Sequence, residues 1–332
     1  MEQNFDHWEA LPSSEAEEEE LKQIRKSLNR HNWKTVCISV AAAITLVLAF
    51  VYGILPFVEK CYPDPYSAHL ADSLEAYIEL TKPGKTLTLS YGKTGFASYD
   101  LFLNCIDTAS GEKEILRGSL EKGTLSLDLP FYDRDVNEAY LWSGIVLPQE
   151  VWAHQQEETE TMLRELPEYI TVEAAAWFPE DLTMEQVVQL EMGYSYGEPG
   201  LDIQWLAIRC CEQSQEEQMP TLGFSTQYGG HRDLNDQYPQ LNFDGFEEDG
   251  SHMEMHFKSL LQFSQDQAEQ GLGVSYTNKD GSIFQTALDY VEQQGVKTYA
   301  CLVSGSPSAI LQLLENGVVG SLKLTDGWVD LG

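Results

Sequence analysis

Two histidines four residues apart, His252 and His256, are the pattern in this sequence that comes closest to a metal site. On a helix such a pair faces one way and can hold zinc. Glu254, between them, is misplaced for the helical zinc-protease motif, and the pair lies where we expect a helix to begin. The acidic run 247–249 could add ligands, although a solvated loop explains it equally well. We therefore predict a partly exposed histidine pair without a metal.

Three further patterns match chemical motifs only by their letters. The run 193–197 reads GYSYG, but a nucleophile elbow needs a strand before the serine and a helix after it. Here the expected order is helix then strand, so we predict a loop. The run 233–236 lacks the glycine and the closing glutamate of a calcium loop. Cys210 and Cys211 are too isolated to indicate redox chemistry. No phosphate loop or dinucleotide fingerprint occurs, so we predict no enzyme, catalytic residue, metal or cofactor.

The elements that would position these residues follow a long apolar run. Thr35 to Val58 are 24 consecutive residues without a charged side chain. As a helix they would cover about 36 Å, against a hydrocarbon core of about 30 Å. A buried helix of a soluble core rarely needs such a run. A cleavable signal peptide is the stronger alternative, but the 34 residues before the run contain an acidic cluster and no small-residue cleavage site follows. The run predicts an uncleaved transmembrane signal anchor.

The flanking charges predict the orientation of this helix. Five basic residues lie in the segment 22–34 before the run, whereas only Lys60 follows it within a similar distance. Because cytoplasmic flanks are enriched in lysine and arginine, the amino terminus is expected in the cytoplasm of a single-pass cell-membrane protein. Residues 59–332 are then extracytoplasmic.

The part expected outside carries 45 acidic and 15 basic residues, a formal charge of −30. Such a charge argues against direct contact with nucleic acid and is suited to solubility, cations or basic peptides. Its five cysteines are odd in number and match no dense disulfide framework or paired zinc site.

The tail, residues 1–34, is predicted to contain an amphipathic helix from Ser14 towards the membrane. Ser14 and Glu17 have the spacing of a capping box, and acidic residues precede basic ones along the segment, as the helix dipole favours. One interpretation is a disordered tip followed by an extension of the spanning helix. The other is a docking segment, whose candidate contacts are two aromatic residues and an apolar stripe. These residues are Phe5, Trp8, Leu21, Ile24 and Leu28.

Beyond the anchor we predict a small β-rich domain, 59–130, which contains a helical face over 70–78 before its strands. Alternating or β-rich runs separated by turn residues predict four strands, 86–91, 99–106, 115–121 and 124–127. The segment 131–165 is expected to be a connector with a helix from about 151.

The remainder, 166–332, is expected to be a larger α+β domain, which makes the fold class α+β. The predicted order is strand 170–177, helix 183–190, strand 201–208, a loop-rich stretch 211–251, helices 253–263 and 282–294, strand 297–303, helix 307–315 and strand 318–324. Two βαβ-type units, with Pro179 and Pro307 at matching places, suggest a duplication of the ferredoxin-like kind.

Ordered motifs over about residues 160–332 resemble the sigma-factor regulator family of Gram-positive bacteria. The motifs are Leu166–Glu168, Val172–Ala174, Phe178, Leu182–Thr183, Gln204–Trp205, Gly223–Phe224, Tyr238–Leu241, His256–Leu261, Ala287–Glu292, Gly295–Val296, Tyr299 and Gly305. Family members often have Tyr-Gly where this chain has Tyr299-Ala300, a departure that leaves the expected fold unchanged.

The resemblance implies a membrane-anchored anti-sigma factor whose tail binds an extracytoplasmic-function sigma factor. The five tail residues named above then become its expected contacts. A surface sensor or envelope-binding module without sigma-factor contact is the competing class, and a membrane-tethered metallohydrolase using His252 and His256 comes third. The extracytoplasmic ligand cannot be named from the sequence.

Overall fold

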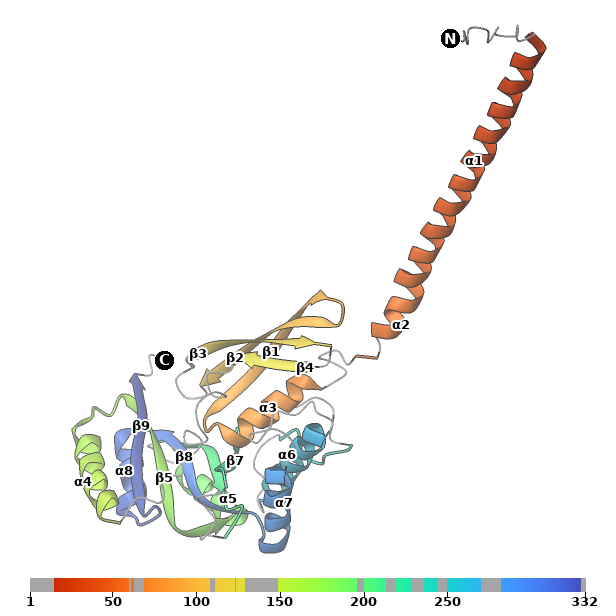
Figure 1. Ribbon diagram of the computed structural model, residues 1–332. Helices are drawn as coiled ribbons and strands as arrows, with labels where there is room; N and C mark the ends of the chain where they lie inside the picture. Colours follow the sequence, from red (N-terminus) through yellow and green to blue (C-terminus); the bar gives the residue numbers. More distant parts are fainter. Residues whose placement is uncertain are drawn as a thin grey trace, which may run out of the picture. The chain divides into compact units, whose positions relative to one another are not determined.

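The computed structural model describes most of the chain (Figure 1). The described residues are 15–59, 61–62, 69–107, 111–122, 124–128, 149–195, 200–212, 219–227, 234, 236–243, 250–269 and 282–329. They divide into two compact units, residues 1–62 and 63–332.

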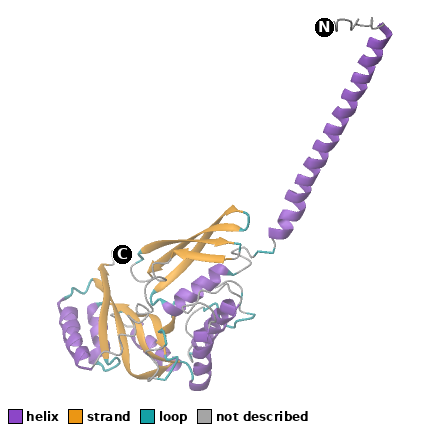
Figure 2. Cartoon of the chain, in the orientation of Figure 1, coloured by secondary structure: helices purple, strands orange, loops and turns teal. Residues whose placement is uncertain are grey.

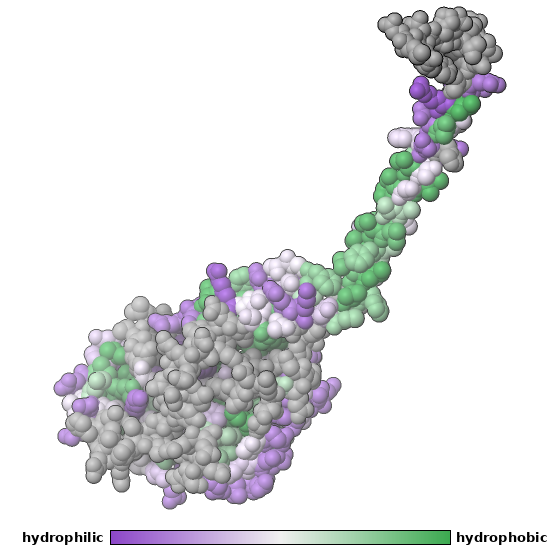
Figure 3. All heavy atoms as spheres, in the orientation of Figure 1, coloured by the Kyte–Doolittle hydropathy of each residue, from purple (hydrophilic) through white to green (hydrophobic). Residues whose placement is uncertain are grey.

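In the first unit, the described residues 15–59 are helical. Helix α1 (Glu15–Ala49) continues through a π-helical turn, Phe50–Ile54, into α2 (Leu55–Glu59). Pro56 has no N–H to donate to the turn before it, and a wider π turn just ahead of it accommodates that loss. Figure 3 shows hydrophobic side chains covering much of this helix. The segment Lys22–Val58 is long and apolar enough to cross a membrane by length and composition alone.

The second unit begins with α3 (Leu70–Thr81) and a four-stranded antiparallel sheet. The strands lie in chain order and are β1 (Lys85–Gly95), β2 (Ser98–Asp107), β3 (Lys113–Glu121) and β4 (Thr124–Asp128). Leu101, Leu103 and Cys105 of β2 are buried while Phe102 between them is exposed, which is the alternation expected of a sheet with one face on a core. The predicted helix and four strands are confirmed.

The later part of the second unit contains a five-stranded antiparallel sheet. Its order is β7-β6-β8-β5-β9. The strands are β5 (Ile170–Thr183), β6 (Leu201–Ile208), β7 (Leu222–Ser225), β8 (Lys297–Gly305) and β9 (Ser321–Val329). The helices of this region are α4 (Gln149–Glu165), α5 (Met184–Ser195), α6 (Ser251–Glu269), α7 (Ser282–Gln294) and α8 (Pro307–Glu315). Figure 2 shows helices and strands mixed along this part of the chain, and the fold is α+β.

The two predicted βαβ units have the same arrangement. Helix α5 connects β5 to β6 with β8 between them, and α8 connects β8 to β9 with β5 between them. Because every ladder in the sheet is antiparallel, both units join parallel strands across one intervening strand. This is the split βαβ order of ferredoxin-like folds, with β7 added at one edge.

The predicted correspondence of Pro179 with Pro307 is wrong. Pro307 is the first residue of α8, where Ser306 caps the helix by accepting from the N–H of Ala309. Pro179 instead lies inside β5, at a shift in the β5–β8 register, where a missing N–H is tolerated. The cap of α5 is Thr183, which exchanges hydrogen bonds with Gln186 in a capping box.

The stretch 211–251, predicted to be loop-rich, contains β7. This strand has only four residues, too few to show a period, and it forms because β6 offers it a partner. The hydrophobic core runs without a break from the four-stranded sheet to the five-stranded sheet, since α3 contacts β1, β7 and α6. Leu74, Ile78 and Leu80 of α3 are buried in this core.

Candidate functional site

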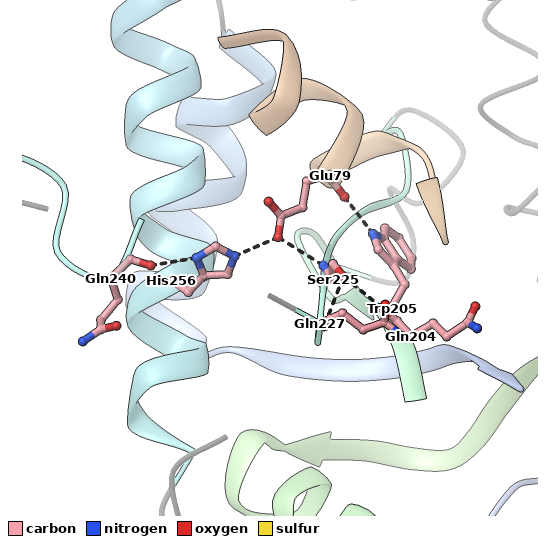
Figure 4. Close-up of polar contacts among 7 residues, drawn as sticks. All are labelled: Glu79, Gln204, Trp205, Ser225, Gln227, Gln240 and His256. Atoms are coloured by element: carbon pink, nitrogen blue, oxygen red, sulfur yellow. Dashed lines mark hydrogen bonds and ion pairs between the residues drawn. The ribbon is translucent and has the colours of Figure 1, made fainter. Parts of the chain in front are cut away.

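A buried polar cluster lies where α3, β7 and α6 meet (Figure 4). At its centre, His256 of α6 is fully buried, with an exposed fraction of 0%. Its Nε2 lies 2.8 Å from Oε1 of Glu79 on α3, and its Nδ1 lies 2.8 Å from the carbonyl oxygen of Gln240. Both ring nitrogens of His256 are therefore engaged.

The acceptors around His256 determine where one proton lies. The carbonyl oxygen of Gln240 can only accept, so Nδ1 of His256 carries a hydrogen and donates it. The contact between Nε2 and the Glu79 carboxyl group then also holds one proton, on the imidazole or on the carboxyl group. In either arrangement the pair is neutral overall. A pair of this kind satisfies both groups without leaving an isolated charge in the core.

Aromatic packing fixes the imidazole ring of His256. The ring of Phe243 lies tilted at 5.0 Å between centroids, and the ring of Phe224 meets it edge-on at 5.6 Å. Phe224 comes from β7, and Phe243 follows the turn that contains Gln240. Rings on two sides leave the imidazole one orientation, so its two nitrogens point at fixed partners.

The turn that supplies the Gln240 carbonyl is itself tied to α6. Ser259 donates to the carbonyl of Pro239 at 2.5 Å, and Tyr238 donates its hydroxyl proton to Asp266 at 2.8 Å. Burial, together with this hydrogen bond, raises the pKa of the Tyr238 phenol above its ordinary value. The phenol therefore stays a donor at neutral pH, and the turn holds its carbonyl against His256.

Glu79 also contacts the five-stranded sheet. The backbone N–H of Ser225 on β7 donates to Oε1 of Glu79 at 3.3 Å, and the indole N–H of Trp205 on β6 donates to the Glu79 carbonyl at 2.7 Å. The first contact satisfies an N–H of the short strand β7, and the second satisfies a carbonyl in the last turn of α3. The side chain and the backbone of one residue thus attach α3 to two strands.

Two glycines permit this close approach. A Cβ on Gly223 would lie 2.0 Å from the carbonyl oxygen of Leu206 and 2.3 Å from the Trp205 ring, so only glycine fits beneath the indole. Gly84, which follows α3, has φ +65° and would place a Cβ 2.7 Å from Leu302. Its left-handed conformation lets the chain turn from α3 into β1 while it stays close to β8 of the five-stranded sheet.

The arrangement differs from the histidine pair expected from the sequence. His252 is partly exposed, and its Nε2 lies 3.4 Å from the side-chain nitrogen of Gln240. His256 was expected to be partly exposed and is instead buried, because α3 and the turn around Gln240 cover it. Among the described residues no group of three or more histidine, cysteine or acidic side chains could hold a metal ion.

The other chemical patterns are distributed through the fold. Gly193 and Ser195 lie in the last turn of α5, so the expected loop is wrong for residues 193–195, and residues 196–197 lie outside the described residues. The helix-then-strand order is confirmed. Asp233 lies outside the described residues. Cys210 and Cys211 are buried and free, and burial raises the pKa of both thiols.

A second polar cluster lies at the end of β6. Arg209 makes a two-point contact with Asp181, with both nitrogen–oxygen distances 2.9 Å. Its guanidinium carbon lies 4.4 Å from the centre of the Tyr299 ring. This arrangement requires arginine. The ammonium group of lysine cannot donate two parallel hydrogen bonds to one carboxylate, and it has no planar group to stack on an aromatic ring.

The tail residues predicted to bind a partner are described only in part. Ile24 and Leu28 lie in α1 with exposed fractions of 53% and 54%. Leu21 belongs to the same helix, whereas Phe5 and Trp8 lie outside the described residues. Ser14, the predicted cap, also lies outside them.

Sequence reasoning missed Glu79, Ser225 and Gln240 as members of the cluster. Glu79 sits in a helix of ordinary composition, and nothing near it in the sequence points to His256. Trp205 and His256 belong to motifs that carry the family resemblance, and the structure brings these motifs together around a residue that lies outside the resemblance.

The structure defines an α+β protein of the split βαβ class, with an amino-terminal helix long and apolar enough for a membrane. Residues 163–326 match the family model described as sigma factor regulator C-terminal. This match assigns residues 163–326 to the sigma factor regulator family. A search of curated proteins and a search of solved structures found no match. Family membership indicates an anti-sigma role and a sigma factor as partner.

Proposed function

We propose that this protein is a membrane-anchored anti-sigma factor whose cytoplasmic tail sequesters an extracytoplasmic-function sigma factor, under the control of its extracytoplasmic part. The family match over residues 163–326 is the observation that carries the proposal. The apolar helix supports the anchor, and the basic segment 22–34 supports a cytoplasmic amino terminus.

The exposed apolar pair on α1 supports a partner site in the tail. Ile24 and Leu28 are four residues apart, so they lie on the same face of the helix, one turn from each other. They precede the uncharged run that starts at Thr35 and are flanked by charged residues such as Arg25 and Lys26. Apolar anchors at this spacing are what a helix presents when it docks in a groove of another protein.

The test is capture of the cognate sigma factor by a tail fragment, residues 1–34. We expect the fragment to bind, and we expect Ile24→Asp or Leu28→Asp to weaken binding at least tenfold, since an anchor in a pocket contributes about 1–2 kcal/mol or more. Asn29→Asp adds the same charge on another face of the helix and serves as the matched control. Binding can be measured by isothermal titration calorimetry.

Two results would refute this assignment. One is equal binding by the fragment 63–332, which would place the sigma-factor site outside the tail. The other is the absence of binding by the tail and by the full chain, which would favour a surface sensor or envelope-binding module without sigma-factor contact.

A further inference from the structure

Helix α3 lies in the sequence between the apolar helix and the residues that match the family model. It is the first helix of the second unit in the part of the chain that the structure describes, and ten residues separate it from the end of α2. It lies outside the residues that match the family model, 163–326, yet it contacts β7 and α6 within them. Among the described helices of the second unit, α3 is therefore the one nearest in sequence to the apolar helix.

Most contacts of α3 are apolar and depend little on orientation. Leu74, Tyr77 and Leu80 are buried in the continuous core. Apolar contact alone would leave α3 free to slide or rotate by a small amount, because dispersion and hydrophobic burial are not directional. The contacts of Glu79 are directional, and they join α3 to three separate elements of the matched region.

Each partner of Glu79 is fixed independently of α3. The His256 ring is set by Phe224 and by the Gln240 carbonyl, and the Ser225 N–H is set by the pairing of β7 with β6. The Trp205 indole is set by its strand and by the close approach of Gly223. A prearranged acceptor-and-donor set of this kind receives a carboxyl group in one position only.

Removal of one member leaves the other in the core without its partner. His256 has an exposed fraction of 0%, and Glu79 has one of 7%, so water does not replace the lost contact without opening the interface. Breaking a buried pair from one side is strongly destabilising, whereas removal of both sides is much less so. The docked position of α3 thus depends on the pair as a unit.

We propose that Glu79 and His256 form a polar lock that holds α3 against the residues matched by the family model, 163–326, and so determines whether α3, ten residues after the end of α2, stays docked. The lock adds a means of regulation to the proposed function. It rests on that function in one respect, because it takes the apolar helix to be a membrane anchor. The apolar contacts of α3 provide most of the stability of its packing, and the Glu79–His256 pair fixes the position in which α3 packs.

Hydrogen–deuterium exchange of the full chain in detergent micelles tests the lock. The readout is the amide exchange rate of peptides from α3 divided by that of peptides from α8, so that changes in global stability cancel. We expect Glu79→Ala and His256→Ala each to raise this ratio about 100-fold. The double variant should raise it no further than the larger single effect, because the two side chains act together.

Two further variants separate the lock from general stability. Leu313→Ala removes a buried side chain of α8 and should not raise the ratio. Glu79→Gln keeps the length of the side chain, but the contacts of Glu79 with His256 and Ser225 are both made by Oε1, so the amide can either donate to Nε2 of His256 or accept from Ser225 and not both. Its ratio should therefore lie between those of the unchanged protein and Glu79→Ala.

The proposal would be overturned if both alanine variants left the exchange ratio unchanged. It would also be overturned if the ratio of the double variant rose by the product of the two single increases. An exchange ratio for Glu79→Gln as high as that for Glu79→Ala would overturn it as well. The measurement is independent of sigma-factor capture by the tail, so failure of the lock and failure of the proposed function are distinguishable.

Discussion

The carboxyl group of Glu79 and the imidazole of His256 meet at 2.8 Å, although the two residues are 177 positions apart in the chain. Glu79 belongs to α3, which precedes both sheets in the chain. His256 belongs to α6, which follows β7 and precedes β8 in the chain. Their contact joins the residues matched to the sigma factor regulator family with a helix outside that match.

Gly223 of β7, which lies beneath the Trp205 indole, should not tolerate replacement by alanine. Gly223→Ala would place a Cβ 2.0 Å from a backbone carbonyl, so the strand pair or the indole must move. We expect a loss of about 3 kcal/mol or more in the free energy of unfolding, measured by urea denaturation in mild detergent. Gly193→Ala in α5 is the control: nothing lies within 4 Å of its Cβ, and it should add about 0.5–1 kcal/mol. Equal effects of the two changes would contradict this packing.

The Arg209 contact should depend on the shape of the guanidinium group and not only on its charge. Arg209→Lys keeps the charge but loses the two parallel hydrogen bonds to Asp181 and the stacking on Tyr299. We expect a loss of about 1–2 kcal/mol in thermal or urea unfolding. Arg164→Lys serves as the control, because its pair with Glu315 is half exposed and should change stability by less than about 0.5 kcal/mol. A smaller loss at Arg209 than at Arg164 would refute the argument.

Cysteine reactivity should separate exposed from buried thiols. Cys61 is exposed, whereas Cys105, Cys210, Cys211 and Cys301 are buried. Burial raises the pKa of the Cys210 and Cys301 thiols, so little thiolate is present at neutral pH. A membrane-impermeant maleimide at pH 7.5 should label Cys61 within minutes and the four buried thiols only after denaturation, as read by peptide mass spectrometry. Labelling of Cys210 at the rate of Cys61 would show that the edge of this sheet opens readily.

Alkaline conditions should destabilise the protein in part through Tyr299. Burial raises the pKa of its phenol to about 12, against 10 in an unperturbed chain. A raised pKa means that this contribution to stability is complete below pH 10 and is lost as the pH rises from 10 to 12, because the unfolded chain releases its proton first. Tyr299→Phe should therefore show a shallower loss of unfolding free energy between pH 10 and 12. An identical slope in the two proteins would place the alkaline loss at other groups, such as Tyr238 or the buried thiols.

The sequence determined the local elements of this protein because their signals are local. Twenty-four uncharged residues from Thr35 predict an apolar helix by length alone, and the structure has a helical segment there. Alternating or β-rich runs separated by turn residues predicted the four strands of the first sheet, and β6 was predicted with its observed bounds. The order of the motifs between 160 and 332 was sufficient for the family.

The tertiary structure alone decided which side chains meet. Strand β7 forms only because β6 presents an edge, and Pro179 fits inside β5 only because the register shifts there. His256 was expected to be partly exposed near the start of a helix, and it is buried because α3 and the turn at Gln240 cover it. Periodicity reports which face of an element is apolar, whereas the partner of a buried polar group depends on topology that links distant segments. For this reason His256 was visible in the sequence as a candidate, and Glu79 was not.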